Sequence, residues 1–260
     1  MKILVTGGAG FIGSNYLHHE VENKPYNNYV CLDLLTYAGN YNNIKDLENK
    51  NNFKFIKGDI ADYKLVDSIF EKEKIDLVIN FAAESHVDNS IQNPLLFTKT
   101  NVIGTQTLLE ICRKHGNIRF HQISTDEVYG ELNLDSKEKF REDSLIKPNN
   151  PYSTTKACAD LLVLSYYKTY KLPITISRCT NNFGPYQYPE KLIPMTITSI
   201  LNNEKITIHG KGISVRDWIS VKDHINAINL IIEKGTIGEI YNICSKEEIS
   251  VQNIVKIILN

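Results

Sequence analysis

Short runs of β-branched and other apolar residues alternate, through the first part of the chain, with longer stretches in which apolar positions recur at helical spacing. The short runs read as strands, and they are Lys2–Thr6, Tyr29–Asp33, Phe53–Lys57, Leu77–Phe81, Arg119–Ser124 and Pro173–Arg178. This alternation predicts right-handed βαβ units, and therefore a parallel sheet covered by helices on both faces. The expected fold class is α/β, with a doubly wound sheet.

The local composition of the sequence changes near Asn181, where the stretch NNFGPYQYPEKLIP is rich in proline and aromatic residues, as functional loops often are. The elements expected beyond it are a helix over Leu192–Leu201, a strand over Ile206–Ile208, a helix over Val221–Glu233, a strand over Ile240–Ile243 and a helix from Val251. We expect residues 1–180 to form the sheet domain, to which the chain returns around 218–240. Residues 181–260 should form a smaller substrate-binding region, which the family resemblance described below implies is incomplete at its C-terminal end.

Composition narrows the classes of protein that fit. The chain has 260 residues, 42% of them hydrophobic, and a formal net charge of -1, so it can bury a full core and has no cationic excess for a nucleic-acid or membrane surface. The five cysteines are scattered, without metal-ligand spacing. We therefore expect a cytoplasmic protein with no metal site, and with neither nucleic acid nor membrane as a partner.

A glycine-rich turn follows the first expected strand. Gly7, Gly10 and Gly13 allow a tight turn and a close backbone approach, while the helix that begins at Phe11 offers free N–H groups to phosphates. Asp33 ends the second strand, where a carboxylate accepts hydrogen bonds from an adenosine ribose and repels a 2′-phosphate. This arrangement predicts a Rossmann-like dinucleotide site that prefers NAD to NADP.

Two further pairs carry candidate chemistry. Tyr152 and Lys156 stand one turn apart at the start of an expected helix, and a nearby ammonium should lower the pKa of the phenol so that it can accept a proton. Asp126 and Glu127 follow the fifth strand, at the edge of the sheet where open α/β folds bind their ligands. Burial beside Glu127 should raise the pKa of Asp126.

Motifs along the whole chain resemble, in order and spacing, the signatures of dTDP-glucose 4,6-dehydratases, which are extended short-chain dehydrogenases/reductases. They are TGGAGFIGS, AAESHVD, STDEVYG, PYSTTK, TNNFGPYQYPEKLIP and VRDWISVKDH. The resemblance implies an NAD-dependent hydro-lyase that acts on dTDP-glucose. The acidic pair in STDEVYG argues against a sugar 4-epimerase, which needs hydride chemistry but no elimination of water.

The same resemblance implies a mechanism. Tyr152, assisted by Lys156, takes the proton of the hydroxyl on sugar carbon 4 as hydride passes to NAD. Glu127 then removes the hydrogen of carbon 5 while Asp126 protonates the departing hydroxyl of carbon 6. Hydride returns to carbon 6, and the product is a 4-keto-6-deoxy sugar nucleotide.

Residue by residue, the resemblance implies three sets of positions. The catalytic set is Thr125, Asp126, Glu127, Tyr152 and Lys156. The cofactor set is Gly7, Gly10, Phe11, Ile12, Gly13, Asp33, Thr36, Asp59, Ile60, Ala82, Ala83, Thr100, Tyr152, Lys156 and Asn182. The substrate set is Ser85, Thr125, Asn181, Lys191, Leu192, Arg216 and Asn242. Arg216 is the expected clamp on the pyrophosphate, because a guanidinium matches phosphate geometry.

Alternatives remain open at this point. Thr207–His209 departs from the family pattern in the expected nucleotide pocket, which leaves a UDP-, CDP- or GDP-hexose as a rival substrate. The other hypotheses are a non-catalytic NAD-binding protein and a 4-epimerase. The helices expected near Leu95–Cys112 and Thr154–Tyr170 are more apolar than one sheet face requires, which predicts a homodimer through a four-helix interface.

Overall fold

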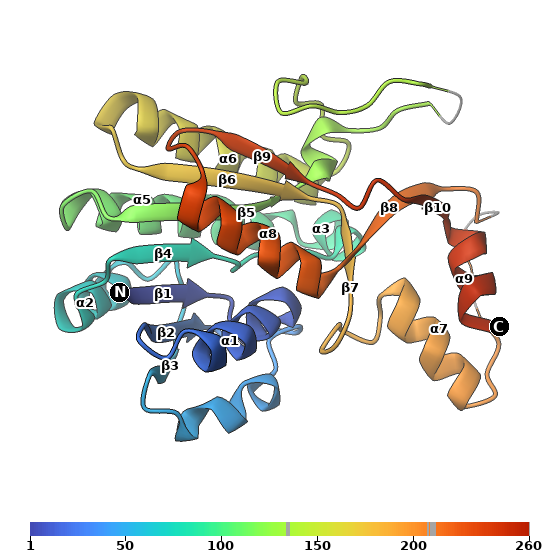
Figure 1. Ribbon diagram of the computed structural model, residues 1–260. Helices are drawn as coiled ribbons and strands as arrows, with labels where there is room; N and C mark the ends of the chain where they lie inside the picture. The colour runs from blue at the N-terminus through green and yellow to red at the C-terminus, as the bar shows by residue number, and fades with distance from the viewer. Residues whose placement is uncertain (134–135, 207, 209–211, 260) are drawn as a thin grey trace.

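Seven parallel strands form the central sheet of the computed structural model, in the order β3-β2-β1-β4-β5-β6-β9 (Figure 1). The structure describes residues 1–133, 136–206, 208 and 212–259. The strands of this sheet are β1 (Lys2–Thr6), β2 (Asn28–Asp33), β3 (Phe53–Lys57), β4 (Leu77–Asn80), β5 (Arg119–Thr125), β6 (Ile174–Cys179) and β9 (Ile240–Ile243). The predicted α/β, Rossmann-like, doubly wound sheet is confirmed.

Helices cover both faces of this sheet, which is why its strands read as near-continuous apolar runs. The helices of the chain are α1 (Phe11–Asn23), α2 (Tyr63–Glu73), α3 (Val87–Gln92), α4 (Pro94–Phe97), α5 (Thr105–Lys114), α6 (Pro151–Tyr170), α7 (Leu192–Leu201), α8 (Val221–Lys234) and α9 (Val251–Leu259). Helices α1 and α8 pack over one hydrophobic cluster, and α2, α5 and α6 pack over the other. The sheet is thus the middle layer of three.

Shorter helical segments join these elements. They are the 3₁₀ turns η1 (Tyr41–Asn43), η2 (Lys45–Asn49) and η4 (Asp126–Tyr129), and the π-helix η3 (Thr98–Gly104). The π-helix lies between α4 and α5, where the sequence predicted one uninterrupted helix. Single-turn π segments often mark functional sites, and Thr100 of this one faces the cavity described below.

The strand order changes direction between β1 and β4, since the chain winds outward from β1 to β3 and then returns to add β4 on the other side. Loops that leave these two strands diverge and open a crevice at their carboxyl ends, which is where doubly wound folds bind ligands. Strand β9 extends the sheet beyond β6 after an excursion of the chain through a second region.

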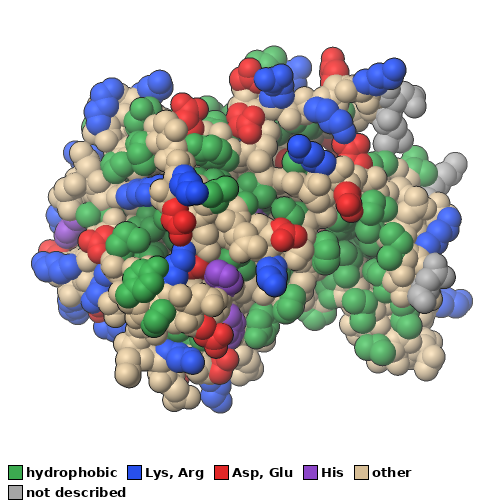
Figure 2. Space-filling model, viewed as in Figure 1, with side chains coloured by type: hydrophobic (Ala, Val, Ile, Leu, Met, Phe, Trp, Pro, Cys, Tyr) green, Lys and Arg blue, Asp and Glu red, His purple; other side chains and the backbone are tan. Residues whose placement is uncertain are grey.

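That second region contains a three-stranded sheet with the order β10-β8-β7 (Figure 1). Its strands are β7 (Asn181–Phe183), β8 (Val215–Ser220) and β10 (Glu248–Ser250). Helices α7 and α9 pack against each other beside it. Figure 2 shows apolar side chains gathered where Figure 1 places these two helices. The exposed apolar residues of α7 and α9 include Ile197, Leu201 and Ile257.

Most element predictions are confirmed to within one or two residues, and the short strands of the second region were missed. The strand predicted over Ile206–Ile208 is wrong at Ile206 and Ile208, which lie in irregular backbone, whereas Thr207 and His209 lie outside the described residues. Over the described ranges the model contains no helix long and apolar enough to cross a membrane. Nor do the described residues gather three or more His, Cys, Asp or Glu side chains around a possible metal ion.

Truncation of the core beneath α5 provides a test of this layering. Leu108 is fully buried between α5 and the sheet, so Leu108→Ala should lower the free energy of unfolding by about 2–5 kcal/mol. Leu145→Ala is the matched control, because Leu145 is 74% exposed and its loss should cost less than about 0.5 kcal/mol. Urea unfolding of both variants at one protein concentration measures the difference, and equal losses would contradict this assignment of the core.

Candidate active site

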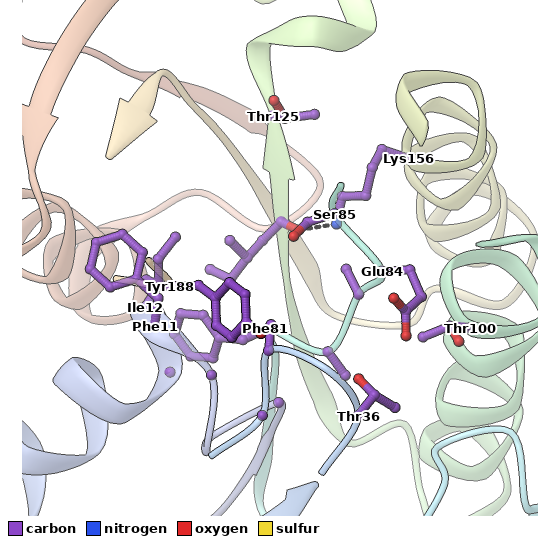
Figure 3. A pocket seen from close by; sticks show the side chains of 18 of the residues that line it. Phe11, Ile12, Thr36, Phe81, Glu84, Ser85, Thr100, Thr125, Lys156 and Tyr188 are labelled. Atoms are coloured by element: carbon purple, nitrogen blue, oxygen red, sulfur yellow. Dashed lines mark hydrogen bonds between the residues drawn. The ribbon is translucent and has the colours of Figure 1, made fainter. Parts of the chain in front are cut away.

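A cavity of about 330 Å³ opens at the carboxyl ends of β1, β4, β5 and β6 (Figure 3). Thr36, Glu84 and Thr100 lie toward one end of it, and Thr125 and Lys156 lie toward the other. Residues far apart in the sequence meet here because parallel strands end at the same edge of a sheet.

The glycine turn forms the floor of the cavity. Gly7 has a φ of +68°, and a Cβ on it would lie 2.5 Å from the backbone nitrogen of Ala82. A Cβ on Gly13 would lie 2.4 Å from the carbonyl oxygen of Gly7. Both positions therefore require glycine for backbone packing alone.

Gly10 serves a different purpose, because it is the N-cap residue of α1 and lines the cavity. A Cβ there would have as its one near neighbour the carbonyl oxygen of Gly7, at 3.3 Å, so the protein itself leaves room for it. A side chain at this position would fill the cradle in front of the first N–H groups of α1. The empty cradle, the free N–H groups and the helix dipole fit a pyrophosphate.

Asp33 closes β2 at the same end of the cavity. One carboxylate oxygen accepts a hydrogen bond from the backbone N–H of Ala9 at 2.9 Å, and the other accepts one from Leu35 at 2.8 Å. Burial raises the pKa of this carboxyl, and the two backbone bonds act against that rise. Its orientation is thus fixed by the backbone, with a carboxylate edge left at the cavity wall for a ribose.

The helix that carries Tyr152 and Lys156 begins with a capping box. The side chain of Asn150 accepts a hydrogen bond from the backbone N–H of Ser153 at 2.8 Å, and the Ser153 hydroxyl accepts one from the backbone N–H of Asn150. Lys156 is 4% exposed, and its ammonium donates to the carbonyl oxygen of Ile123 at 2.6 Å. The cap and this bond fix the start of α6 against the end of β5.

The electrostatic prediction for Tyr152 is wrong in this structure. Burial, followed by the negative charge of Glu127, raises the pKa of the phenol well above its usual value, whereas we expected Lys156 to lower it. The ammonium of Lys156 is engaged by a backbone carbonyl, and burial lowers its own pKa. Desolvation is therefore the largest effect on the pKa of this phenol, and Lys156 does not act against it.

The prediction for the acidic pair is confirmed for Asp126. Burial and the like charge of Glu127 raise the pKa of Asp126 to about 6, and burial raises that of Glu127 as well. Arg216 acts against both rises, and Lys191 acts against that of Glu127. A carboxyl with such a pKa is partly protonated near neutral pH, as a general acid must be.

Every residue of the expected catalytic and cofactor sets lines this one cavity, as do Ser85, Asn181 and Lys191 of the substrate set. Leu192 starts α7 next to Lys191 but is not part of the wall. Arg216 is exposed on β8 and reaches the site through its charge. Asn242 lies on β9, where its side chain accepts a hydrogen bond from Tyr129 at 2.8 Å.

Sequence reasoning missed several residues that line the cavity. Glu84 is 3% exposed, and burial raises its pKa. The backbone of Glu84 is held on both sides by the amide side chain of Asn101 in η3, at 2.9 and 3.0 Å. The other unassigned wall residues are Leu32, Leu34, Tyr37, Ala38, Gly39, Gly58, Phe81, Ile123, Ser124, Cys179, Thr180, Gln187, Tyr188 and Glu190. Six of these fifteen residues belong to the quoted motifs, which was the available signal, and they are Glu84, Ser124, Thr180, Gln187, Tyr188 and Glu190.

Comparison with known proteins gives a consistent result. The model of the family described as GDP-mannose 4,6 dehydratase matches residues 4–260. A dTDP-glucose 4,6-dehydratase of Mycobacterium tuberculosis is 48% identical over 248 residues, which are 95% of this chain and 73% of that protein.

Two solved structures extend the comparison. A dTDP-glucose 4,6-dehydratase from Bacillus anthracis in complex with NAD is 44% identical, with a TM-score of 0.93, and the match covers 100% of this chain and 80% of that one. A dTDP-glucose 4,6-dehydratase from Streptomyces venezuelae with NAD and TYD bound is 41% identical, with a TM-score of 0.95 and the same coverage.

The raised pKa of Asp126 makes a prediction about stability. The folded state binds this proton more tightly than the unfolded chain, so the resulting stabilisation is complete below about pH 4 and is lost as pH rises through about 6. At about pH 8 the free energy of unfolding of Asp126→Asn should therefore be about 2 kcal/mol higher than that of the wild type, a figure reduced for solvent in the cavity.

Denaturant unfolding at about pH 8 and about pH 4 measures this difference, which should shrink at the lower pH. Asp143→Asn is the control, because the Asp143 side chain is 86% exposed. A gain for Asp126→Asn that is equal at both values of pH would contradict the assignment.

Proposed function

The chain belongs to the nucleotide-sugar dehydratase family that the GDP-mannose 4,6 dehydratase model describes, and from this premise we propose that it is an NAD-dependent hydro-lyase that converts dTDP-glucose to dTDP-4-keto-6-deoxyglucose. One observation carries the proposal. Asp126 and Glu127 line the same cavity as Tyr152 and Lys156, so groups for elimination and for oxidation face one space.

The residues around the cradle are those that hold the cofactor. Gly7, Gly10 and Gly13 bring the backbone and the N-terminus of α1 to the pyrophosphate, and Asp33 accepts hydrogen bonds from the adenosine ribose. When bound, NAD accepts a hydride from carbon 4 of the sugar and returns it to carbon 6.

Tyr152 is the group that takes the proton from the hydroxyl of carbon 4. Because burial and the charge of Glu127 raise its pKa, the phenol stays protonated until a cation lies beside it. An oxidised nicotinamide ring carries such a charge and would lower this pKa on binding. Thr125 lies beside the phenol and holds the oxygen of carbon 4.

Asp126 and Glu127 divide the elimination of water between them. Glu127 takes the hydrogen of carbon 5 as a proton, and Asp126 gives its proton to the hydroxyl that leaves carbon 6 as water. The pKa of about 6 at Asp126 supports the acid role at neutral pH. The proton held by Glu127 returns to carbon 5 when hydride reaches carbon 6. Asp126 regains one proton and Tyr152 releases the one that it took from the hydroxyl of carbon 4, so the cycle consumes no net proton.

Cations at the mouth of the cavity bind the sugar nucleotide. Lys191 and Arg216 both lower the pKa of Glu127, so their charges lie within reach of the acidic pair. Arg216 is exposed and its guanidinium donates to the carbonyl oxygen of Val215 at 2.8 Å, which leaves its other donors for phosphate oxygens. Leu192 and Asn242 complete the substrate-binding side.

All five cysteines are free. Unpaired thiols, three of them buried, fit a reducing compartment, and on this ground we place the protein in the cytoplasm.

The test of the activity is turnover of dTDP-glucose by the purified protein, with UDP-glucose in parallel. We expect the 4-keto-6-deoxy product, followed by its absorbance in alkali, from dTDP-glucose, and a rate at least about 100-fold lower for Glu127→Gln. Glu131→Gln is the control, because Glu131 is an exposed acid just beyond the same turn. Product from UDP-glucose alone would move the substrate to another nucleotide, a 4-epimer would indicate an epimerase, and no product with NAD bound would indicate a non-catalytic protein.

The protein forms a homodimer through the face that carries α3, α4, η3 and α6. Exposed apolar side chains of these helices include Ile91, Leu95, Leu96 and Leu161, of which Leu95 is 82% exposed. The helices α4, η3, α5 and α6 pack together on one face of the sheet (Figure 1). A second copy turned by a two-fold axis would cover this surface with the same surface.

Introduction of a negative charge at matched positions tests the interface. Leu161→Glu should convert the dimer to a monomer in light scattering, because it buries a charge in an apolar contact. Leu230→Glu is the control, since Leu161 and Leu230 are both 54% exposed and Leu230 lies on α8, on the opposite face of the sheet. A monomeric wild type, or equal dissociation by both variants, would contradict the proposal.

A further inference from the structure

A buried ion pair lies directly behind the cavity, outside its wall. Arg178 is 1% exposed and Asp160 is fully buried, and the guanidinium Nε donates to a carboxylate oxygen of Asp160 at 2.9 Å. The Nη1 of Arg178 donates to the hydroxyl of Tyr129 at 2.8 Å, and the guanidinium lies 4.8 Å from the centre of that ring. One side chain thus binds two elements of the site in different directions.

The first of these elements is the helix of the oxidising couple. Asp160 lies one turn after Lys156 on α6, and its negative charge raises the pKa of the Lys156 ammonium against the effect of burial. Among the other titratable groups around that ammonium, Cys179 of β6 acts in the same direction. Asp160 therefore favours the charged form of the lysine.

The second element is the turn of the eliminating pair. Tyr129 is the last residue of η4, whose first two residues are Asp126 and Glu127. Its hydroxyl accepts from Arg178 and donates to the side chain of Asn242 on β9, at 2.8 Å. Its ring stacks on Phe140 at 5.1 Å. The end of the acidic turn is thereby fixed to β6 and β9.

Strand register explains how these contacts meet. Arg178 is paired with Ser124 of β5 on one side and with Asn242 of β9 on the other, so the three side chains lie on the same face of the sheet. That face is the one covered by α6, which brings Asp160 over them. Arg178 is thus the middle residue of this row, from which its guanidinium reaches Asp160 on α6 and Tyr129 on η4.

Stability alone does not account for this pair. Burying an arginine and an aspartate costs desolvation, and apolar replacements of a buried ion pair are often neutral or stabilising. Within the described residues, the Nη2 of Arg178 finds no hydrogen-bond partner, whereas the Ser124 hydroxyl lies close enough to Asp160 to lower the pKa of that carboxyl. The cost is therefore not fully offset on the arginine side. Such an arrangement is expected where a fixed geometry is needed.

We propose that Arg178 is a positioning residue that sets the spacing between the oxidising couple on α6 and the eliminating pair on η4, by holding Asp160 and Tyr129 at once. The inference rests on the proposed function, because it assigns oxidation to one element and elimination to the other. Each end of the network then governs one step. Loss of the Tyr129 contact slows elimination, and loss of the Asp160 charge slows oxidation at carbon 4.

The experiment compares Tyr129→Phe, Asp160→Asn and Arg178→Lys with the wild type on dTDP-glucose, using substrate deuterated at carbon 4 or at carbon 5. Tyr129→Phe should lower kcat about tenfold or more, enlarge the isotope effect from carbon 5 and make the reduced cofactor accumulate in absorbance. Asp160→Asn should instead enlarge the isotope effect from carbon 4. Arg178→Lys should follow Tyr129→Phe, because an ammonium can replace the charge beside Asp160 but not the second arm of the fork.

Tyr166→Phe is the matched control. Like Tyr129, Tyr166 is a buried tyrosine whose hydroxyl bonds another side chain, but it lies on α6 and its partner, Glu110, is away from the cavity. Thermal unfolding identifies any variant that does not fold, and Tyr129→Phe, which keeps the ion pair, carries the test if Arg178→Lys or Asp160→Asn fails to fold.

The outcomes distinguish a failure of the proposed function from a failure of the inference about Arg178. A wild type that makes no product from dTDP-glucose overturns the proposed function and the inference with it. An active wild type whose Tyr129→Phe variant shows unchanged isotope effects, or a loss equal to that of Tyr166→Phe, overturns the inference alone.

Discussion

The contact on which the site depends is the one between the backbone of Gly7 and the start of the loop after β4. No side chain fits there, since a Cβ would lie within 2.8 Å of three backbone atoms of Phe81 and Ala82. This approach places the N-terminus of α1 against the loop that carries Glu84 and Ser85, at the point where the strand order reverses. The floor, one wall and the anion-binding end of the cavity follow from it.

Around that floor, burial shifts the acid–base groups in one direction. The pKa values of Asp126, Glu127 and Tyr152 are raised, and those of Lys156 and Lys191 are lowered, with desolvation as the largest cause in each case. Each group is therefore brought toward its neutral form. Donors and acceptors whose pKa values are shifted in this way, and which line one cavity, are suited to exchanging protons with a substrate, and the charge of a bound ligand then affects which group ionises.

Much of this could be predicted from the sequence, because the determining features are local. The strands of a parallel sheet are apolar throughout, the glycine spacing belongs to one kind of turn, and Tyr152 with Lys156 needs only a helix to become a pair. The raised pKa of Asp126 could be expected from burial at the edge of the sheet and from its neighbour Glu127 in the chain. The pKa of Tyr152 could not, because it depends on how deeply the fold buries the ring and on the carbonyl of Ile123 that engages Lys156. The pairing of Arg178 with Asp160 could not be predicted from the sequence either, since only strand register and helix packing bring these residues together.

The path of the chain after β6 has a consequence for how such proteins can diversify. Residues between β6 and α8 leave the central sheet to build β7, α7 and β8, and the chain then comes back to supply α8 and β9 before leaving again for β10 and α9. The second region, which we propose binds the sugar nucleotide, is thus built from two segments separated by α8 and β9 of the core. Recombination that exchanges substrate preference must transfer two separate segments together, whereas a single crossover near residue 180 would also replace an edge strand of the sheet. Change by point substitution within loops is therefore the more accessible evolutionary route for this architecture.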